Sequence, residues 1–411
     1  MADLSIPVFV QLPGYTHKVL AGELSWDPAT KVGSFQYATD YFKLERAYPL
    51  DLFGLPRRPR KETRNDGIYG ILRDAGPDAW GRDLLERTHG ALDAIGILTH
   101  APQDGAGNIT FHPEQQLRTY SLAEIDDVSK GFPPDDSALA IALDQPTSMG
   151  GAKPKLLAYD QGAFWMAKFP ENNDPEYKNA ANEHAMLAMA AQCGIDAAES
   201  RVHQLPDGRL ILLVKRFDLA GAPGEFTRLG FASAHTVLGM GDPLKDGDLK
   251  SYPLLRFQGR RWTQTEIGPD LWRRLAFNAL VSNMDDHARN HAFVYDGKWS
   301  LSKAFDIVAA PADGPVRLIL RITRDTVIAT PQSLLDSADE MGVERDQAID
   351  SLRAMAGLVL DQWRGHIRDG WMTGGSIDIL KKAFRLAEEV AKFDYAALPL
   401  PARSKRYRRH G

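Results

Sequence analysis

Residues 283–291 read Asn-Met-Asp-Asp-His-Ala-Arg-Asn-His, a polar run between an apolar helical stretch and an apolar hairpin signal. Within this run Asp285 precedes Asn290 by five positions, and Asp306 follows the next hairpin in Ala-Phe-Asp-Ile. Protein kinases use the same order of Asp, four residues, Asn, a hairpin and a second Asp. In them one aspartate orients the attacking hydroxyl, while the asparagine and the second aspartate hold Mg²⁺. The stretch therefore predicts a phosphoryl-transfer site.

The residue types suit this chemistry. Mg²⁺ prefers carboxylate, amide and phosphate oxygens, and Asn290 and Asp306 would supply the first two kinds. A carboxylate that stays free of the metal is needed to accept a proton. The spacing gives that role to Asp285, although Asp286 next to it is a second candidate.

Two other interpretations of the same stretch remain open. Asp285, His287 and His291 could bind a transition metal, since the two histidines stand four positions apart, as zinc-binding histidines on a helix do. No HExxH pattern accompanies them, however. The stretch could also be a capped loop without any chemistry.

Three further segments fit a phosphoryl-transfer site. Lys168 ends an apolar strand and Glu183 lies in the first turn of the next helix, the order of an ion pair that positions phosphate. The strand that ends at 214–218 would be the hinge, which offers adenine two main-chain bonds and ribose a carboxylate. Residues 148–155, Ser-Met-Gly-Gly-Ala-Lys-Pro-Lys, supply backbone amides that can bind phosphate, although they match neither common glycine-rich motif.

The composition limits the class of protein. The 411 residues carry 54 acidic and 49 basic side chains and are 44% hydrophobic, as in ordinary globular proteins and unlike a general nucleic-acid binder. A single cysteine, Cys193, excludes a disulfide framework and CxxC metal sites, so we expect a cytoplasmic protein. There is no signal-peptide pattern and no apolar run long enough for a membrane span. The basic tail 401–411 is typical of a solvated terminus.

The first third of the chain has the pattern of a small mixed α/β domain. Strand-like composition occurs at 6–12, 17–25 and 33–38. Asp78 can cap a helix, and a short strand is predicted near residue 110. A polar stretch follows, so we place the first domain boundary near 115.

The rest of the chain predicts a sheet followed by helices. Strands are expected at 155–159, 163–169 and 209–214, with a helix at 179–194 between the last two, which makes an antiparallel sheet carrying one helix. From about residue 270 helical patterns dominate, apart from a probable hairpin at 292–301. The expected domains are 1–115, 116–235 and 236–411.

Taken together, these segments resemble the HipA toxin family of serine/threonine kinases. The resemblance in the second and third domains is carried by Ser148–Lys155, Lys168-Phe-Pro, Asn182-Glu183, Val214–Asp218, Met284–Asn290 and Phe305-Asp306. Residues 22–42, 70–85 and 104–113 resemble the N-terminal subdomain of that family. The resemblance implies an α+β, bilobed protein-kinase-like fold with an added N-terminal mixed α/β subdomain and an all-helical C-terminal lobe.

The resemblance also implies cofactors and partners. These are ATP and Mg²⁺, a small helix-turn-helix antitoxin like HipB, operator DNA only through that antitoxin, and no membrane. The protein substrate would be an aminoacyl-tRNA synthetase, whose phosphorylation halts charging and leads to growth arrest or persistence. A catalytically silent HipA-like regulator that helps to repress DNA is the alternative of another class. A small-molecule phosphotransferase would share the same loops.

The resemblance assigns roles position by position. Asp285 resembles the catalytic base and Lys168 the phosphate-binding lysine, while Asn290 and Asp306 resemble the Mg²⁺ ligands. The residues expected at the nucleotide are Gly150, Gly151, Ala152, Lys153, Lys155, Lys168, Lys215, Phe217, Asp218, His287, Asn290 and Asp306. Ser148 resembles the serine that the family autophosphorylates, with Thr147 as a rival acceptor.

Overall fold

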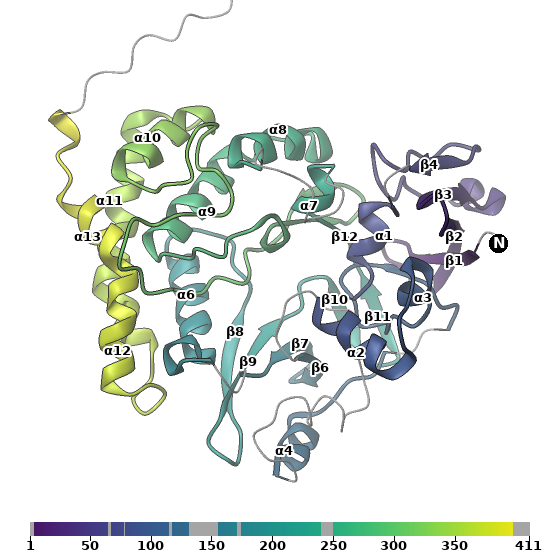
Figure 1. Cartoon of the computed structure of the whole chain (residues 1–411), viewed down its shortest axis with the longest axis horizontal. Coiled ribbons are helices and arrows are strands. Elements are labelled where there is room, and N and C mark those ends of the chain that lie inside the picture. The colour runs from purple at the N-terminus through teal and green to yellow at the C-terminus, as the bar shows by residue number, and fades with distance from the viewer. Residues whose placement is uncertain are drawn as a thin grey trace, which may run out of the picture.

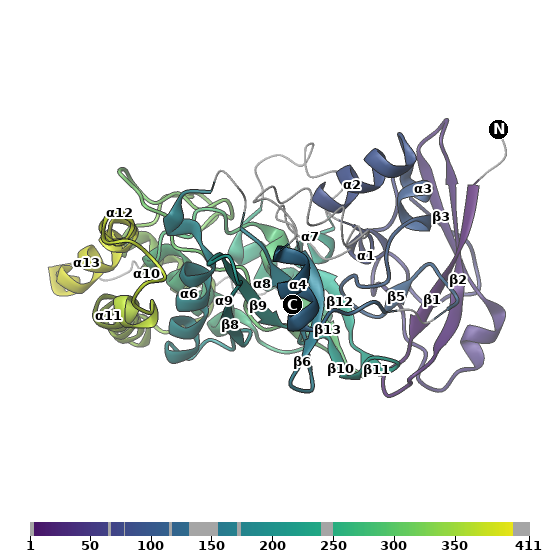
Figure 2. The same ribbon diagram turned by 90° about the horizontal axis from the view of Figure 1, so that it is seen from below.

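The computed structural model describes residues 4–64, 67–77, 79–114, 117–130, 155–170, 174–239 and 250–397. The molecule is elongated, with a sheet from the N-terminal residues at one end and the C-terminal helices at the other (Figures 1 and 2). A second sheet with one helix lies between them. Within the described residues, no helix is both long enough and apolar enough to cross a membrane.

The N-terminal part is built on an antiparallel sheet with strand order β4-β3-β2-β1-β5. Its strands are β1 (Leu4–Gln11), β2 (Lys18–Asp27), β3 (Val32–Tyr37), β4 (Glu62–Arg64) and β5 (Ile109–Thr110). The helices of this part are α1 (Gly70–Asp74), α2 (Ala79–His89) and α3 (Ala94–Thr99), with a 3₁₀ turn η1 (Thr39–Lys43). Val8 and Val10 alternate with more exposed residues and are fully buried, which is the period-two pattern that the sequence predicts for a strand. The expected strands of this part are confirmed.

The middle sheet has the order β6-β7-β9-β8. Its strands are β6 (Lys155–Asp160), β7 (Ala163–Lys168), β8 (Ser200–Gln204) and β9 (Leu210–Lys215), and the helices of this part are α4 (Leu122–Lys130), η2 (Glu176–Lys178) and α6 (Ala180–Gln192). The expected hairpin β6–β7, helix α6 and strand β9 are confirmed. The sequence analysis missed β8, whose side chains are all half-buried or exposed, so it lacks the apolar signal of its neighbours.

Two features fix the ends of α6. The side chain of Asn179 accepts a hydrogen bond from the Ala181 N–H and caps the first turn. Beyond the last turn, Gly194 has φ of +76°, in the left-handed region that glycine enters most readily. The helix therefore begins and ends where the sequence predicts, and Glu183 falls in its first turn.

A second ladder joins the middle of the chain to its helical part. After the hairpin of β10 (Leu219–Ala222) and β11 (Glu225–Arg228), strand β12 (Gly230–Ser233) pairs with β13 (Ala292–Tyr295), which pairs with β14 (Trp299–Leu301). The expected hairpin at 292–301 is thus confirmed, and β12 adds a third strand to it. The ladder crosses the expected division at 235/236, because β12 precedes that line and β13 follows it. The three-domain division stays a proposal.

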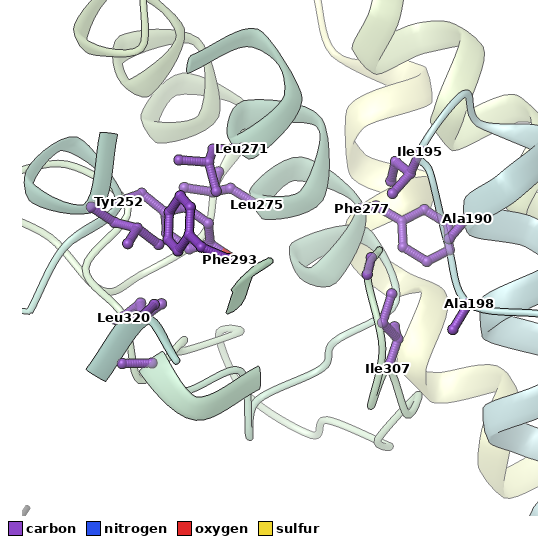
Figure 3. Packing of buried hydrophobic residues seen from close by; sticks show 14 of the residues in the cluster. Ala190, Ile195, Ala198, Tyr252, Leu271, Leu275, Phe277, Phe293, Ile307 and Leu320 are labelled. Carbon is purple, nitrogen blue, oxygen red and sulfur yellow. The ribbon is translucent and has the colours of Figure 1, made fainter. Parts of the chain in front are cut away.

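Helices make up the rest of the third part. They are α7 (Ala234–Val237), α8 (Tyr252–Thr263), α9 (Gly268–Leu280), η3 (Ala288–Asn290), α10 (Pro331–Glu340), α11 (Arg345–Gln362), η4 (Trp363–His366), α12 (Gly374–Lys381), η5 (Lys382–Phe384), α13 (Arg385–Lys392) and η6 (Tyr395–Ala397). Phe277 of α9 lies in one buried group with Ala190 of α6 and with Ile307 (Figure 3). Since Ile307 directly follows Asp306, this packing anchors one edge of the candidate site.

Candidate active site

A cavity of about 510 Å³ lies between the middle sheet with α6 and the polar loops of the helical part. This volume is in the range of small-molecule and cofactor sites. The chargeable and amide side chains that line it are Lys155, Lys168, Asp174, Lys178, Asn179, Glu183, Asn283, Asp285, Asn290 and Asp306. Lys168 and Asp306, which are 138 positions apart in the sequence, thus line the same cavity. Residues that the sequence predicts for a kinase site therefore meet here.

Lys168 is the centre of the charge arrangement in this cavity. At the end of β7, its Nζ lies 2.7 Å from Glu183 Oε1 and 2.7 Å from Asp306 Oδ1. Burial by itself would lower the pKa of Lys168, but the two carboxylates outweigh it and hold that pKa above its usual value. The lysine is therefore a fixed cation, held between a helix and a loop.

Asp306 is held in an unusual backbone conformation. Its φ is +59°, a left-handed value that non-glycine residues adopt only when surrounding contacts impose it. The Asn283 side chain donates to its carbonyl oxygen at 3.5 Å, and the ring of Phe305 lies 5.8 Å from that of Phe217, centroid to centroid. Burial alone would raise the pKa of Asp306, but the Lys168 ammonium outweighs this and lowers it. The carboxylate is thus kept ionised.

The neighbours Asp285 and Asp286 have opposite environments. Asp285 is exposed and lines the cavity. Asp286 is 1% exposed, accepts a hydrogen bond from the Tyr252 hydroxyl, and lies 2.9 Å from His291 Nε2. Both oxygens of Asp286 are engaged in the interior, so the geometry favours Asp285 as the carboxylate that a substrate could reach.

Asn290 and Asp306 form a donor set that suits Mg²⁺. Asn290 donates from Nδ2 to the main-chain oxygen of Asp285 at 3.1 Å, which uses the nitrogen end of the amide and leaves the oxygen end for a cation. Both residues line the cavity. One carboxylate and one amide are few ligands, but Mg²⁺ is commonly held by one or two protein groups together with substrate phosphates. The residues present therefore fit an Mg²⁺–nucleotide complex.

The alternative of a transition-metal site finds no support in the geometry. His291 is committed to Asp286 in the interior, and His287 is not among the residues that line the cavity. In the described ranges no three His, Cys, Asp or Glu side chains gather as a metal would require. His287 does lie close enough to Asp306 to interact with that carboxylate electrostatically. Its expected contact with the nucleotide stays a prediction.

The phosphate loop can be followed only from Lys155 onward. Lys155 is 2% exposed, begins β6 and lines the cavity. The other residues predicted there, Gly150, Gly151, Ala152 and Lys153, lie outside the described residues, as do Ser148 and Thr147. The basic tail 401–411 is outside them as well.

The predicted hinge residues are placed differently. Lys215 Nζ pairs with Glu199 Oε2 at 2.7 Å, and neither Lys215, Phe217 nor Asp218 lines the cavity. Asp218 is 3% exposed and accepts two bonds from Arg216, at 2.7 Å each, and one from the Gly107 N–H at 2.8 Å. The structure therefore does not bring Asp218 together with the other predicted site residues, because its oxygens are engaged by its neighbour and by the N-terminal part.

Burial would raise the pKa of Asp218, but the guanidinium of Arg216 outweighs it and lowers that pKa. Arg216 and Arg228 also donate to main-chain oxygens of the segment 103–107 in the N-terminal part. Arg216, Asp218 and Arg228 thus connect the middle of the chain to the N-terminal part. A ribose contact of Asp218 stays a prediction.

The sequence analysis quoted two asparagines at the site but gave neither of them a role. Asn283 supports the main chain of Asp306, and Asn182, one position before Glu183, is fully buried and bonded to the loop that follows Asp306. A polar residue in an apolar segment marks a functional site or a satisfied core residue equally well, so the pattern alone could not assign these contacts.

Comparisons with known proteins agree with the fold. The model described as HipA-like C-terminal domain matches residues 147–363, more than half of the chain, and the HipA N-terminal domain model matches residues 14–112. A solved structure of Shewanella oneidensis HipA, in complex with HipB and its operator DNA, aligns with a TM-score of 0.69 and 20% identity over 94% of this chain and 100% of that one.

Two curated relatives are more similar in sequence. The serine/threonine-protein kinase toxin HipA of Shewanella oneidensis is 24% identical over 309 residues, 67% of this chain and 69% of that protein. Y4dM of Sinorhizobium fredii, designated a kinase by inference, is 26% identical over 246 residues, 52% of this chain. The match spans 54% of its length, about half of that relative.

Proposed function

This chain belongs to the HipA family, since models of both HipA domains match it, and from that premise we propose that it is an ATP- and Mg²⁺-dependent protein serine/threonine kinase. The observation that carries the proposal is the arrangement around Lys168. Its ammonium lies 2.7 Å from both Glu183 and Asp306, in a cavity that Asp285 and Asn290 also line. A lysine on a strand, a glutamate on the next helix and two acidic loops are the parts that phosphoryl transfer by a protein kinase needs.

Each residue has a role that its position supports. Lys168 and Lys155 would bind phosphate oxygens, while Asn290 and Asp306 would hold Mg²⁺, which neutralises phosphate charge when bound. Asp285, which is exposed and free of the Lys168 ion pair, would orient the acceptor hydroxyl and take its proton. The buried Tyr252–Asp286–His291 contacts would hold the loop that carries Asp285.

Thermal unfolding with ATP, with and without Mg²⁺, tests this function. A ligand that binds only the folded chain stabilises it by RT ln(1 + [L]/Kd), about 2.7 kcal/mol at a hundredfold excess over Kd. We expect ATP to raise the unfolding midpoint clearly only when Mg²⁺ is present. The reason is that Asn290 and Asp306 would contact the phosphates only through the bound metal ion. Equal stabilisation with and without Mg²⁺ would favour the silent regulator instead.

The biological role is proposed on the same premise. The related structure is named as a complex of HipA with HipB and operator DNA, which supports a HipB-like antitoxin as the partner of this chain. We propose that this antitoxin is a helix-turn-helix protein and that the chain meets operator DNA only through it. We place the chain as the toxin of such a pair, with an aminoacyl-tRNA synthetase as its substrate. Comparing the phosphoproteins of cells that express the wild type and the Asp285→Asn variant would identify the substrate.

Autophosphorylation of Ser148 is part of the proposed function. A phosphate there adds about −1.5 to −2 charge at neutral pH. It would attract the lysines of the cavity and draw residues 149–155 away from the nucleotide. We expect one added phosphate on Ser148 in active preparations incubated with Mg·ATP, and weaker ATP binding by the modified form. Peptide mapping that finds Thr147 modified instead, or neither residue, would contradict this assignment.

A further inference from the structure

Asn182 makes an unusual set of contacts beside the cavity. Its side chain is 0% exposed, although it stands in the first turn of α6 next to Glu183. The amide accepts a hydrogen bond from the Ala309 N–H at 3.0 Å and donates to the Ala309 carbonyl at 2.8 Å. It also donates to the Tyr177 carbonyl at 2.8 Å. Both ends of the amide are thus used on main-chain groups, so the contact with Ala309 imitates one pair of a β-ladder.

The two segments that Asn182 joins are those that hold the cation of the site. Glu183, the next residue on α6, pairs with Lys168, and Asp306, three positions before Ala309, pairs with the same ammonium. The contacts Asn182–Ala309 and Glu183–Lys168–Asp306 therefore close a ring between α6, β7 and the loop. Val308, Ala309 and Ala310 of this loop line the cavity.

The ring matters because the loop is not otherwise favoured in this shape. Asp306 has a left-handed φ of +59°, a backbone conformation that is uncommon outside glycine and that surrounding contacts must hold in place. On the far side of the loop, Ile307 packs with Phe277 in the core (Figure 3). Asn182 supplies a polar contact from α6 to Ala309, three positions after Asp306 in this loop.

We propose that Asn182 is a positioning residue that sets the distance between Glu183 and Asp306, so that both carboxylates meet Lys168 and the Asp306 loop is ready for Mg²⁺ and ATP. This inference rests on the proposed kinase function and adds a specific device to it. Asn182 itself touches neither nucleotide nor metal. Its effect on the reaction passes through the backbone of Ala309.

The test compares Asn182→Ala and Asn182→Asp with a matched control, Asn108→Ala. Asn108 is also a buried asparagine, 1% exposed, whose amide bonds to Gln11 and Tyr48 in the N-terminal part, away from the cavity. Asn182→Asp keeps the size of the side chain and can still accept a hydrogen bond from the Ala309 N–H. It cannot donate, so it places a carboxylate oxygen against the carbonyl oxygens of Ala309 and Tyr177, which repel it. All three variants lose buried hydrogen bonds, so a general loss of stability appears in all of them.

We expect both Asn182 variants to lower kcat/KM for Mg·ATP by about 10²-fold, the size of effect that a misplacement of roughly 1 Å produces. Asn108→Ala should leave kcat/KM within about twofold of the wild type, since its bonds are remote from the site. If Asn108→Ala reduces kcat/KM as much as the Asn182 variants, or if these match the wild type, the proposal is overturned.

A second measurement needs neither nucleotide nor catalysis. In the free protein, the Ala309 amide should exchange its hydrogen at least about tenfold faster in Asn182→Ala than in the wild type, because the variant lacks the side-chain oxygen that accepts from it. An unchanged exchange rate would contradict the positioning role. A wild type that fails to bind Mg·ATP would instead contradict the kinase function and leave the exchange result to decide the role of Asn182.

Hydrogen exchange on the wild type covers the case in which the variants do not fold. The Ala309 amide should exchange slowly in the free protein and more slowly still with Mg·ATP. An Ala309 amide that exchanges as fast as exposed loop amides would show that the contact with Asn182 does not persist, and would overturn the inference.

Discussion

Replacing Asp285 by asparagine is expected to reduce phosphoryl transfer by about 10²–10⁴-fold while the protein still folds and binds Mg·ATP. The physical reason is that Asn is nearly isosteric with Asp but cannot accept the proton of the acceptor hydroxyl. Asp285 is exposed in the cavity and takes no part in the Lys168 ion pair, so its charge is not needed to hold the site together. An assay with labelled phosphate measures the loss of phosphoryl transfer. Calorimetry on the same preparation measures whether Mg·ATP binding is retained.

The matched control for this variant is Asp286→Asn, one position along the chain. Asp286 is 1% exposed and bonded to Tyr252 and His291, so its change should lower the free energy of unfolding by about 1–3 kcal/mol. Activity at low temperature, where the variant is still folded, should stay well above that of Asp285→Asn. An inactive but stable Asp286→Asn, beside an active Asp285→Asn, would reverse the two roles.

Asp306→Ala has the second large expected effect, the loss of Mg²⁺-dependent nucleotide binding. The change removes one of only two side chains in the proposed metal site, and it also removes one of the two carboxylates that pair with Lys168. We expect the affinity for Mg·ATP to fall by more than roughly 10²-fold, because Mg²⁺ depends strongly on its carboxylate ligands. Calorimetry in the presence of Mg²⁺ and of a chelator measures this directly.

Two controls accompany the Asp306 variant. Asp285→Asn should keep the affinity for Mg·ATP, since Asp285 is assigned to the acceptor and not to the metal. The unfolding midpoint of Asp306→Ala without ligand shows how much of the effect is a loss of folded protein. Unchanged Mg·ATP affinity in a folded Asp306→Ala would remove this residue from the metal site.

Local patterns predicted much of the fold. The hairpin β6–β7, helix α6 and the hairpin at 292–301 were predictable because each depends on a period of apolar residues, a capping residue or a turn within a few positions. The candidate site residues were predictable too, because their order and spacing can be read directly along the chain. They are Lys168, Glu183, Asp285, Asn290 and Asp306. Strand β8 was missed because it is half-exposed and carries little apolar signal.

The sequence left choices between residues of one type partly open. The spacing to Asn290 favours Asp285 over its identical neighbour Asp286, and the burial of Asp286 against Tyr252 and His291 separates the two by their environments. Asp218 carries the spacing of a hinge carboxylate, yet Arg216 and the Gly107 N–H, 111 positions away, engage its oxygens. Such contacts depend on which distant segments pack together.

What the sequence by itself determined is the set of parts: an N-terminal sheet, a second sheet that carries Lys168 together with the helix that carries Glu183, and a helical region with the two acidic loops. These follow from hydrophobic periodicity and motif spacing, which are properties of short stretches. Only the tertiary structure decided that Lys168 joins Glu183 to Asp306, that Asp285 faces the cavity, and that Asn182 holds the Asp306 loop. Burial and hydrogen bonding between different segments of the chain, two of these contacts spanning more than 100 positions, set these outcomes, because the side chain that is engaged and the side chain that stays exposed differ only in what packs against them.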